Sequence, residues 1–375
     1  MTVEVAPRPD GLDTLHGPGR VRVTEVGEEP RAFRLYKERC IRADEARQVA
    51  EVDRAGDEQR ALKALTERVE PERARLFTDF RYADAARAVE SVEAVQTRRN
   101  LYGHLPELIE GEIAFEAEHL TYGCYESLAT GRLELVPVRG LVEALREVKD
   151  EDELSLIEQA AAITNEVYDR LAEQRFAGRT EKEIARWLEV QFLELGADSL
   201  AFAISVAAGA NGAHPHGKPG ERLITAGTTV VVDAGCTVAG YNSDCTRTFA
   251  TGVLSDELRH AYDVCLRAQL AGLEAVAPGR SGVEVDRAAR ELIEAEGLGE
   301  TFGHGLGHGV GLEVHEGPYL NQESTGTLAV RNVVTIEPGI YLSGLAGVRI
   351  EDLVVVRGDG VDVLSTFPKG LTTVS

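Results

Sequence analysis

The sequence predicts a protein of mixed α/β (α+β) class with two domains. A chain of 375 residues fits two domains better than one. From about residue 74 onward, strand-like segments alternate with helical ones, as they do in α/β units. The second half then follows the order helix, helix, hairpin, helix, helix, hairpin, which is a weak internal duplication of elements.

The composition limits the classes of binding partner and the cellular compartment that we expect for this protein. The formal net charge of −23 argues against a nucleic-acid partner. The five cysteines are odd in number and include no C-x-x-C pair, which favours free thiols in a reducing compartment. The sequence shows no signal-peptide pattern and no run of about 18 apolar residues. We therefore expect a cytoplasmic protein without a membrane partner.

The first 72 residues carry the weakest signals. Residues 21–26 alternate like a short strand. Residues 42–69 are rich in charge and poor in apolar side chains, which is typical of either an exposed helix or a poorly ordered segment. No long apolar strand is visible in this part of the sequence.

Residues 74–148 show the alternation of strands and helices more clearly. The expected strands are 76–82, which runs into a turn, 113–117, and 133–136, which ends at Pro137. The expected helices are 84–92 and 140–146. A charge run at 149–153 then marks the expected domain boundary, and a long helix follows over 151–176.

Later helix starts are marked by capping patterns. Thr180 with Glu183 forms a capping box, and Ser281 with Glu284 repeats it about a hundred residues later. Ser255 can cap the helix between them. These three starts give the second half its helical framework.

A first predicted hairpin carries two aspartates. The β-branched run 228–233 ends in Asp233, and Asp244 precedes a second strand at 246–249. If the hairpin turns at Val238–Ala239, the two carboxylates oppose each other at a Cβ separation of about 4.5–5.5 Å. Opposed like charges are unfavourable unless a cation lies between them.

A second predicted hairpin repeats this arrangement with two glutamates. Strand 333–337 ends in Glu337, and strand 348–356 contains Glu351, 14 residues further on. Gly344 lies midway, so a turn there would oppose the two carboxylates. A single acidic residue at a strand end is usually a solvated turn residue, but two opposed pairs are much harder to explain by chance.

A glycine-rich run at 303–318 lies between the two glutamates and the two aspartates in sequence. We interpret it as a loop in which the backbone closely approaches another group. His308 and His315 stand seven residues apart within it, and we favour His308 over His304 as a ligand because His315 is then a second functional histidine. The inferred metal site is Asp233, Asp244, His308, Glu337 and Glu351.

This donor set suits hard or borderline divalent ions. Four carboxylates would over-neutralise one ion, so two ions about 3.5–4 Å apart fit the charge better. Mn²⁺ is the first choice, and Co²⁺, Zn²⁺ and Fe²⁺ are the alternatives. Cys236 and Cys245 lie near the aspartates in sequence, and we interpret them as packing residues.

Four of these stretches resemble the pita-bread metallopeptidases, a family that includes Xaa-Pro aminopeptidases, Xaa-Pro dipeptidases (prolidases) and methionine aminopeptidases. They are NSDCTRTF at 242–249, GHGVGLEVHE at 307–316, IEPGIY at 336–341 and RIED at 349–352. Segments 77–82 and 149–154 are similar to the proline-specific branch with a creatinase-like N-terminal domain, which methionine aminopeptidases lack.

The resemblance implies two domains, but one segment of this sequence departs from the family pattern. It implies a creatinase-like domain over 1–148 and a pita-bread catalytic domain over 149–375. Residues 1–72 lack the expected helix and apolar strands. Our hypothesis is that they are a replaced or mis-framed piece of that domain, or a disordered one.

The resemblance also implies roles for single residues. Two metal ions would hold a hydroxide that attacks the peptide carbonyl, with Glu337 as general base. His216 and His315 match the family's active-site histidines, which hydrogen-bond the substrate carbonyl or the tetrahedral intermediate. Arg349 shares a strand face with Glu351, so it orients Glu351, binds a substrate carboxylate or forms a structural ion pair. Tyr241 resembles a position that lines the pocket.

We therefore expect a metal-dependent exopeptidase that cleaves Xaa-Pro bonds at peptide N-termini or in dipeptides, and by resemblance a homodimer. Two alternatives stay open: a creatinase-like hydrolase that needs no metal, and a catalytically inactive pita-bread binding protein. The sequence does not separate an aminopeptidase from a dipeptidase, since Arg349 fits either.

Overall fold

The computed structural model describes residues 73–89, 92–130 and 132–374, together with three short strands. These strands are β1 Thr2–Val3, β2 Val23–Thr24 and β3 Thr66–Glu70. The hypothesis of disorder for residues 1–72 otherwise falls outside the described residues. At the end of that segment, β3 is a strand and not the exposed helix considered above, because its backbone pairs with β4.

Contacts divide the chain into two units, Met1–Arg139 and Gly140–Ser375. In the first unit, β4 pairs antiparallel with β3 and parallel with β5, and β6 pairs parallel with β7. The side chains of Phe77, Leu101, Leu105 and Leu128 form its core. The remaining elements of this unit are β4 Arg73–Thr78, α4 Ala83–Ala88, β5 Glu93–Gln96, α5 Leu101–Leu108, β6 Gly111–Glu116, α6 Tyr122–Leu128 and β7 Leu133–Val138.

Two features of the first unit differ from the expectation. Strand β7 continues through Pro137 instead of stopping there. Among the described strands it pairs with β6 alone, and proline is tolerated in an edge strand. Strand β5 and helices α5 and α6 were not predicted, and α5 contains Pro106, a residue type that normally argues against a helix interior.

The second unit contains two helix pairs that pack on sheets. All three expected capping residues are confirmed, with capping boxes at Thr180 and Ser281 and a single cap at Ser255. In the part of the chain that the structure describes, no helix has both the length and the apolarity needed to cross a bilayer. The helices are α7 Leu141–Arg146, α8 Glu151–Ala172, α9 Glu181–Glu194, α10 Asp256–Ala275 and α11 Gly282–Ala295.

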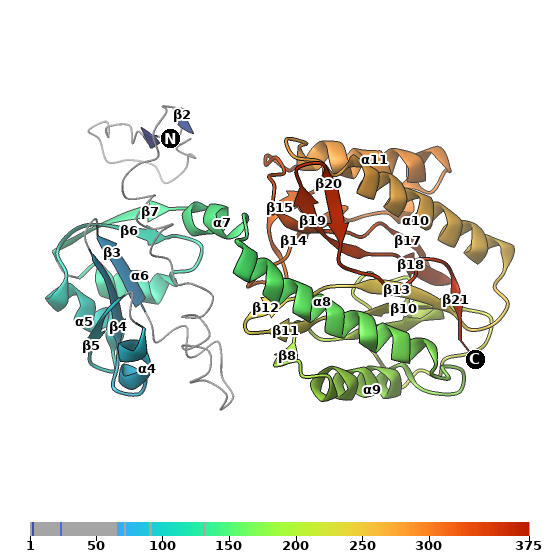
Figure 1. Ribbon diagram of the computed structural model, residues 1–375, viewed down its shortest axis with the longest axis horizontal. Coiled ribbons are helices and arrows are strands. Elements are labelled where there is room, and N and C mark those ends of the chain that lie inside the picture. Colours follow the sequence, from blue (N-terminus) through green and yellow to red (C-terminus); the bar gives the residue numbers. More distant parts are fainter. Residues whose placement is uncertain are drawn as a thin grey trace. The chain divides into compact units, whose positions relative to one another are not determined.

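The strands of the second unit form two larger and two smaller sheets, in the orders β21-β13-β10-β9, β15-β14-β16-β19-β20, β12-β11-β8 and β17-β18. In Figure 1 they lie between α9 below and α11 above. Their bounds are β8 Ser199–Leu200, β9 Ser205–Ala208, β10 Thr229–Asp233, β11 Cys236–Val238, β12 Tyr241–Asn242, β13 Thr246–Ala250, β14 Gly307–Gly309, β15 Glu316–Leu320, β16 Val333–Ile336, β17 Gly339–Leu342, β18 Ala346–Arg349, β19 Asp352–Arg357, β20 Gly360–Val363 and β21 Thr372–Thr373.

Each half of the second unit has its own apolar core. The first core joins α8 and α9 to β9, β10 and β13, with Tyr168 and Phe249 among its largest side chains. The second joins α10 and α11 to β15, β16 and β19. The mixed α/β class and the repeated order of helices and hairpins are thus confirmed. The carboxylate-bearing strands come from both halves.

Candidate metal centre

The first hairpin differs from its predicted register. Asp233 at the end of β10 lies opposite Thr246, and not opposite Asp244. The turn falls at Ala239–Gly240, where both residues have positive φ angles of 48° and 88°. Two-residue hairpin turns of this type need positive φ at both positions, which glycine satisfies and valine does not. The predicted tip at Val238–Ala239 is therefore wrong by one residue, and the pairing shifts by two.

The second hairpin turns where it was predicted to turn. Gly344 has a φ of 74° at the tip, and strands β17 and β18 pair symmetrically about it. The same register continues beyond this ladder into β16 and β19. Glu337 and Glu351 therefore oppose each other in the gap between two ladders. The pairs that flank this gap are Ile336↔Asp352 and Gly339↔Arg349.

The glycine-rich run is a strand at His308 and not a loop. Strand β14 lies between β15 and β16. A Cβ atom on Gly307 would lie 1.9 Å from the carbonyl oxygen of Thr335, and one on Gly309 would lie 2.0 Å from that of Gly317. The backbone of β14 therefore lies very close to the backbones of the adjacent strands, as the glycines in the sequence indicated.

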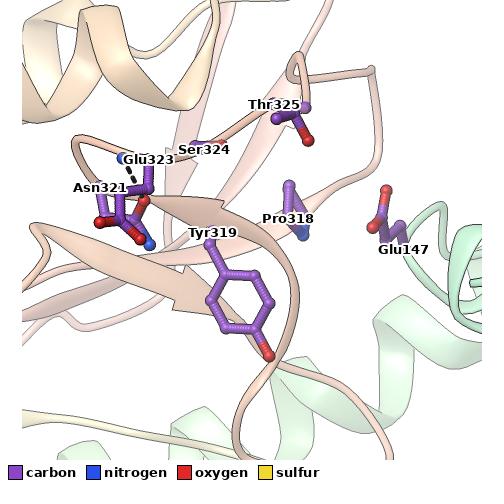
Figure 2. Close-up of a pocket in the computed structure, with 8 residues that line it drawn as sticks. Glu147, Pro318, Tyr319, Asn321, Glu323, Ser324 and Thr325 are labelled. Atoms are coloured by element: carbon purple, nitrogen blue, oxygen red, sulfur yellow. Dashed lines mark hydrogen bonds between the residues drawn. The ribbon is translucent and has the colours of Figure 1, made fainter. Parts of the chain in front are cut away.

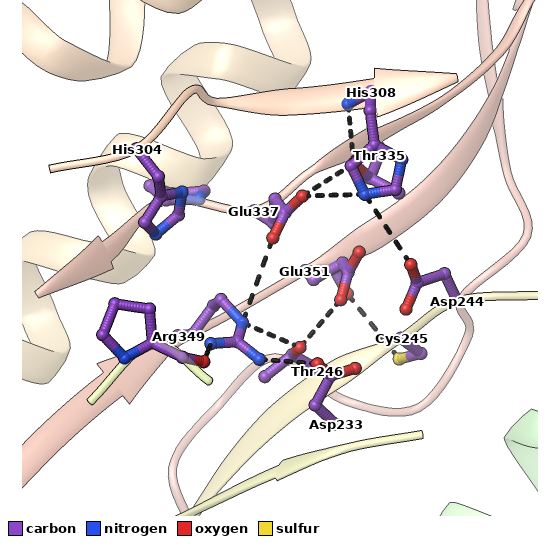
Figure 3. Close-up of polar contacts among 12 residues, drawn as sticks. Asp233, Asp244, Cys245, Thr246, His304, His308, Thr335, Glu337, Arg349 and Glu351 are labelled. Atoms are coloured by element: carbon purple, nitrogen blue, oxygen red, sulfur yellow. Dashed lines mark hydrogen bonds and ion pairs between the residues drawn. The ribbon is translucent and has the colours of Figure 1, made fainter. Parts of the chain in front are cut away.

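His308 lies among the carboxylates (Figure 3). Its Nε2 is 3.1 Å from Oε1 of Glu337 and 3.8 Å from Oδ2 of Asp244. Asp244, His308 and Glu351 each offer a ligand atom, and these atoms lie within 4.8 Å of one another. Nδ1 of His308 is 3.0 Å from the carbonyl oxygen of Gly309, a contact that fixes the ring and directs Nε2 toward the carboxylates.

Arg349 joins Asp233 to the other carboxylates. Its Nη2 is 2.7 Å from Oδ2 of Asp233, and its Nε is 4.0 Å from Oε2 of Glu337. Nε also donates to Oγ1 of Thr246 at 3.0 Å, and that hydroxyl donates to Oε2 of Glu351 at 2.8 Å. All five predicted ligands therefore belong to one connected cluster (Figure 3).

Two carboxylate oxygens of the cluster have no hydrogen-bond partner among the described residues. They are Oδ1 of Asp233 and Oε1 of Glu351, and both are shielded from solvent. A buried polar atom without a partner costs free energy, and such atoms are rare in native proteins. Two unpartnered oxygens beside an imidazole and further carboxylates fit divalent cations, which prefer these donors.

The pKa values of the metal-free cluster reflect crowded negative charge. Burial raises the pKa of Asp244 well above its usual value, and the charges of Glu351 and Asp233 raise it further. Burial raises the pKa of Glu351 in the same way, with Glu337 and Asp233 adding to it.

One pair in the cluster behaves differently. Burial is the largest single influence and favours the neutral forms of His308 and Glu337. Their hydrogen bond and the attraction between their charges together outweigh it, so the pKa of His308 is raised to about 9 and that of Glu337 is lowered to about 2. A proton on His308 thus supplies positive charge in the metal-free cluster.

The remaining predicted histidines lie at different distances from the cluster. The ring centroid of His315 is 4.3 Å from that of His308, so the two stand together. The exposed His216 is close enough to His315 to contribute to lowering its pKa. Nε2 of His304 instead lies 3.0 Å from the hydroxyl of Tyr341, and the structure therefore brings His308 to the carboxylates.

Tyr241 makes its polar contact elsewhere. Its side chain is buried, and its hydroxyl donates to Oε1 of Glu153 in the first turn of α8 at 2.8 Å. Burial and the charge of Glu153 raise its pKa. A role for Tyr241 in lining a substrate pocket stays a prediction.

Several supporting residues were not identified from the sequence. Thr246 donates to Glu351, and Thr335 donates to Oε1 of Glu337 at 3.1 Å. Tyr341 accepts from Nη1 of Arg349 at 3.1 Å. Thr335 stands two positions before Glu337 on a strand, so it shares the face of that carboxylate. This two-residue spacing is the feature of the sequence that could have identified Thr335.

A cavity of about 360 Å³ lies apart from the cluster (Figure 2). Glu147 faces it from one side, and Asn321 and Glu323 face it from the other (Figure 2). None of the eight residues that line it belongs to the cluster: they are Glu147, Pro318, Tyr319, Asn321, Glu323, Ser324, Thr325 and Gly326.

Comparison with known proteins gives the family. Residues 155–358 match the model of metallopeptidase family M24, and residues 62–148 match that of the creatinase/prolidase N-terminal domain. An uncharacterized peptidase of Bacillus subtilis, YqhT, is 38% identical over 307 residues, which cover 80% of this chain and 87% of that protein.

Solved structures agree with this match. An Xaa-Pro dipeptidase from Bacillus anthracis is 34% identical with a TM-score of 0.81, covering 88% of this chain and 100% of the other. An X-Pro aminopeptidase from Thermotoga maritima is 35% identical with a TM-score of 0.75, covering 82% and 89%.

These findings define the protein class as metal-dependent peptidases. The chain belongs to metallopeptidase family M24. The resemblance to the pita-bread peptidases and the expected pita-bread fold are thereby confirmed, as is the likeness to the branch with a creatinase-like N-terminal domain.

Proposed function

We propose that this metallopeptidase is an exopeptidase that cleaves Xaa-Pro bonds, at the N-termini of peptides or in dipeptides. The observation that carries the proposal is the buried cluster in which two carboxylate oxygens, on Asp233 and Glu351, have no donor among the residues that the structure describes. The Xaa-Pro dipeptidase and the X-Pro aminopeptidase similar to this chain support the choice of substrate class.

We propose two divalent ions in the cluster, with Mn²⁺ as the first choice and Co²⁺, Zn²⁺ or Fe²⁺ as alternatives. The proposed ligands are those predicted from the sequence: Asp233, Asp244, His308, Glu337 and Glu351. When bound, such ions polarise a carbonyl group and lower the pKa of water. Four carboxylates against one imidazole leave an excess of negative charge that two dications offset better than one.

Glu337 is the proposed general base. Its low pKa keeps it ionised at neutral pH, and the contacts of Oε1 with His308 and Thr335 fix its orientation. A positioned carboxylate can take a proton from the attacking water and pass it to the leaving amine.

His216 and His315 are the proposed donors to the substrate carbonyl oxygen. Burial, reinforced by His308, lowers the pKa of His315, so its ring is neutral at pH 7 and keeps one N–H to donate. Donors placed at the developing oxyanion stabilise the transition state more than the ground state.

Arg349 is proposed to hold Asp233 and not to bind a substrate carboxylate. Its guanidinium already contacts Asp233, Thr246, Tyr341 and the carbonyl oxygen of Pro215. Its side chain is almost fully buried. Of the roles considered from the sequence, these contacts therefore favour a structural ion pair between Arg349 and Asp233.

The test compares an Xaa-Pro dipeptide, an Xaa-Pro-Yaa tripeptide and a matched Xaa-Ala-Yaa tripeptide after chelation and stepwise return of Mn²⁺. We expect hydrolysis of the proline substrates only when metal is restored. Preference between the first two separates dipeptidase from aminopeptidase. Hydrolysis that is insensitive to chelation would favour the creatinase-like alternative, and no hydrolysis with no bound metal would favour the inactive binding protein.

Two further proposals concern the state of the protein in the cell. We propose a cytoplasmic homodimer, supported by the free cysteines and by the family resemblance. We also propose that 149–375 is the catalytic domain and 1–148 the creatinase-like one. Light scattering of the full chain tests the dimer, and a monomer at micromolar concentration would contradict it.

A further inference from the structure

A buried carboxylate anchors the loop that carries His216. We define the His216 loop as residues 209–220, between β9 and β10. Glu181, the first residue of α9, has only 1% of its surface exposed. It lies 35 residues before His216 in the sequence, so the contact is purely tertiary.

Both oxygens of Glu181 accept hydrogen bonds from the two ends of the loop. Oε1 accepts from the backbone N–H of Ala208 at 2.9 Å, and Oε2 accepts from that of Gly220 at 3.0 Å. The side-chain amide of Asn211 donates to both oxygens, at 3.1 and 3.0 Å. One carboxylate therefore closes the loop at its base, with charge-assisted hydrogen bonds.

The far side of the loop is seated against the candidate metal centre. The carbonyl oxygen of Pro215 accepts from Nη1 of Arg349 at 3.0 Å. A Cβ atom on Gly347 of β18 would lie 1.8 Å from the carbonyl oxygen of Gly212, so the two backbones are in direct contact. His216 follows Pro215, and its position depends on how the base of the loop is held.

We infer that Glu181 is a positioning residue for His216. The inference rests on the function proposed above, because it takes His216 as a group that contacts the substrate. Loops that lack such an anchor are mobile, and a displacement of about 1 Å at a reacting group can lower the rate about 100-fold.

The decisive variant is Glu181→Gln. The amide has nearly the same shape, but it must direct an N–H₂ group at either Ala208 or Gly220, which are themselves donors. Glu183→Gln is the matched control, because Glu183 lies in the same helix turn and is exposed, and its carboxylate accepts from the backbone N–H and hydroxyl of Thr180 in the α9 cap. Asn211→Ala is a milder second variant that leaves both backbone contacts of Glu181 intact.

The first readout is hydrogen exchange at the Ala208 and Gly220 amides in the metal-loaded full chain. Exchange should accelerate at both amides in Glu181→Gln and stay unchanged in Glu183→Gln. Asn211→Ala should accelerate exchange to a smaller extent, and it provides the test if Glu181→Gln does not fold. Wild-type protection in both Glu181→Gln and Asn211→Ala would overturn the anchor.

The second readout is a double-mutant cycle on hydrolysis. Glu181→Gln should lower kcat by about 10- to 100-fold with KM and bound Mn²⁺ unchanged. In a His216→Ala background the same substitution should have no further effect, because Glu181 acts through that ring. A drop of equal size in both backgrounds would overturn the positioning role. If the wild type does not hydrolyse Xaa-Pro bonds, the proposed function fails, and the exchange experiment still tests the anchor.

Discussion

The rings of His308 and His315 are in contact, with centroids 4.3 Å apart and planes tilted by 54°. His308 is directed toward Glu337 and Asp244, whereas His315 is partly exposed. They stand seven positions apart in the sequence, and the bend at 311–315 that reverses the chain brings the rings together. The pair thus links the candidate ligands to a ring that a substrate can reach.

His315→Ala should lower kcat by about 100-fold or more while leaving bound metal unchanged, since loss of one oxyanion donor has an effect of that size. The measurement is steady-state kinetics with metal content determined in the same sample. His260→Ala is the control, because His260 is an exposed histidine in α10. Metal loss in His315→Ala would instead place this residue among the ligands.

Asp244→Ala should abolish metal-dependent hydrolysis and reduce the bound metal. Asp244 is buried, and its carboxylate lies among the ligand atoms of His308 and Glu351. The measurement is elemental analysis together with peptide hydrolysis, with Asp359→Ala at an exposed turn as the control. Activity like that of the wild type in Asp244→Ala would remove the basis of the assigned centre.

The metal-free protein should lose stability as the pH rises from 7 to 9. The pKa of His308 is raised to about 9, so its contribution is complete below its ordinary value of 6.5 and is lost as the pH rises through 9. Raised pKa values at Asp244 and Glu351 act with the same sign, since folding then favours the protonated forms. Glu337, with a pKa lowered to about 2, loses its contribution only in acid, outside this window.

Thermal unfolding at several pH values, with and without saturating Mn²⁺, measures this effect. Tm of the metal-free protein should fall between pH 7 and 9, and metal should raise Tm most at the upper end. His304 and His315 have lowered pKa values and are already neutral there, so they do not oppose the trend. A metal-free Tm that rises over this range would contradict the expected ion pair between His308 and Glu337.

Arg349→Lys should weaken metal binding and activity by about 10- to 100-fold, a typical cost for losing a residue that orients metal ligands. Lysine keeps the charge, but it cannot contact Asp233, Thr246 and Tyr341 at the same time. Titration with Mn²⁺ measures the change in affinity. Unchanged affinity with a raised KM would favour a substrate-binding role for Arg349 instead.

Lys149→Met should destabilise the fold by about 3 kcal/mol, because it leaves the buried carboxylate of Glu316 with Arg146 as its remaining cationic partner. Nζ of Lys149 is 2.7 Å from Oε1 of Glu316, and both side chains are buried. The double variant Lys149→Met, Glu316→Gln should recover part of the loss. Urea unfolding measures it, and equal stability of the single variant and the wild type would show that Arg146, the other partner of Glu316, suffices.

The parts of the fold that sequence could predict depend on short-range chemistry. Capping boxes join residues three apart, so Thr180 and Ser281 identified their helices. The hairpin at Gly344 has glycine at its one left-handed position. The tip at Ala239–Gly240 was misplaced because Ala239 also adopts a left-handed φ there. Alanine rarely adopts this conformation, so the residue type does not predict it.

The candidate metal centre also has a part that the sequence could predict and a part that it could not. Its acidic residues and His308 could be chosen because strand ends and residue types restrict the choice. The contacts that hold them could not, because the partners are distant in sequence. Arg349 was named from the sequence, but its partner Asp233 lies 116 positions away and was not foreseen as such, and Thr246, 105 positions from Glu351, was not identified. No local periodicity reports such pairs, and only the packed sheets bring them together.

The paired ladders on either side of Glu337 and Glu351 have an evolutionary consequence. Because β16–β19 and β17–β18 share one register, the spacing of these glutamates is fixed within the arms of the hairpin and not at its end. The tip at Gly344 can therefore accept extra residues without displacing either carboxylate, whereas a single deletion inside one arm would turn one of them to the opposite face. Length variation among relatives should accordingly be tolerated at 343–345 and excluded from the arms.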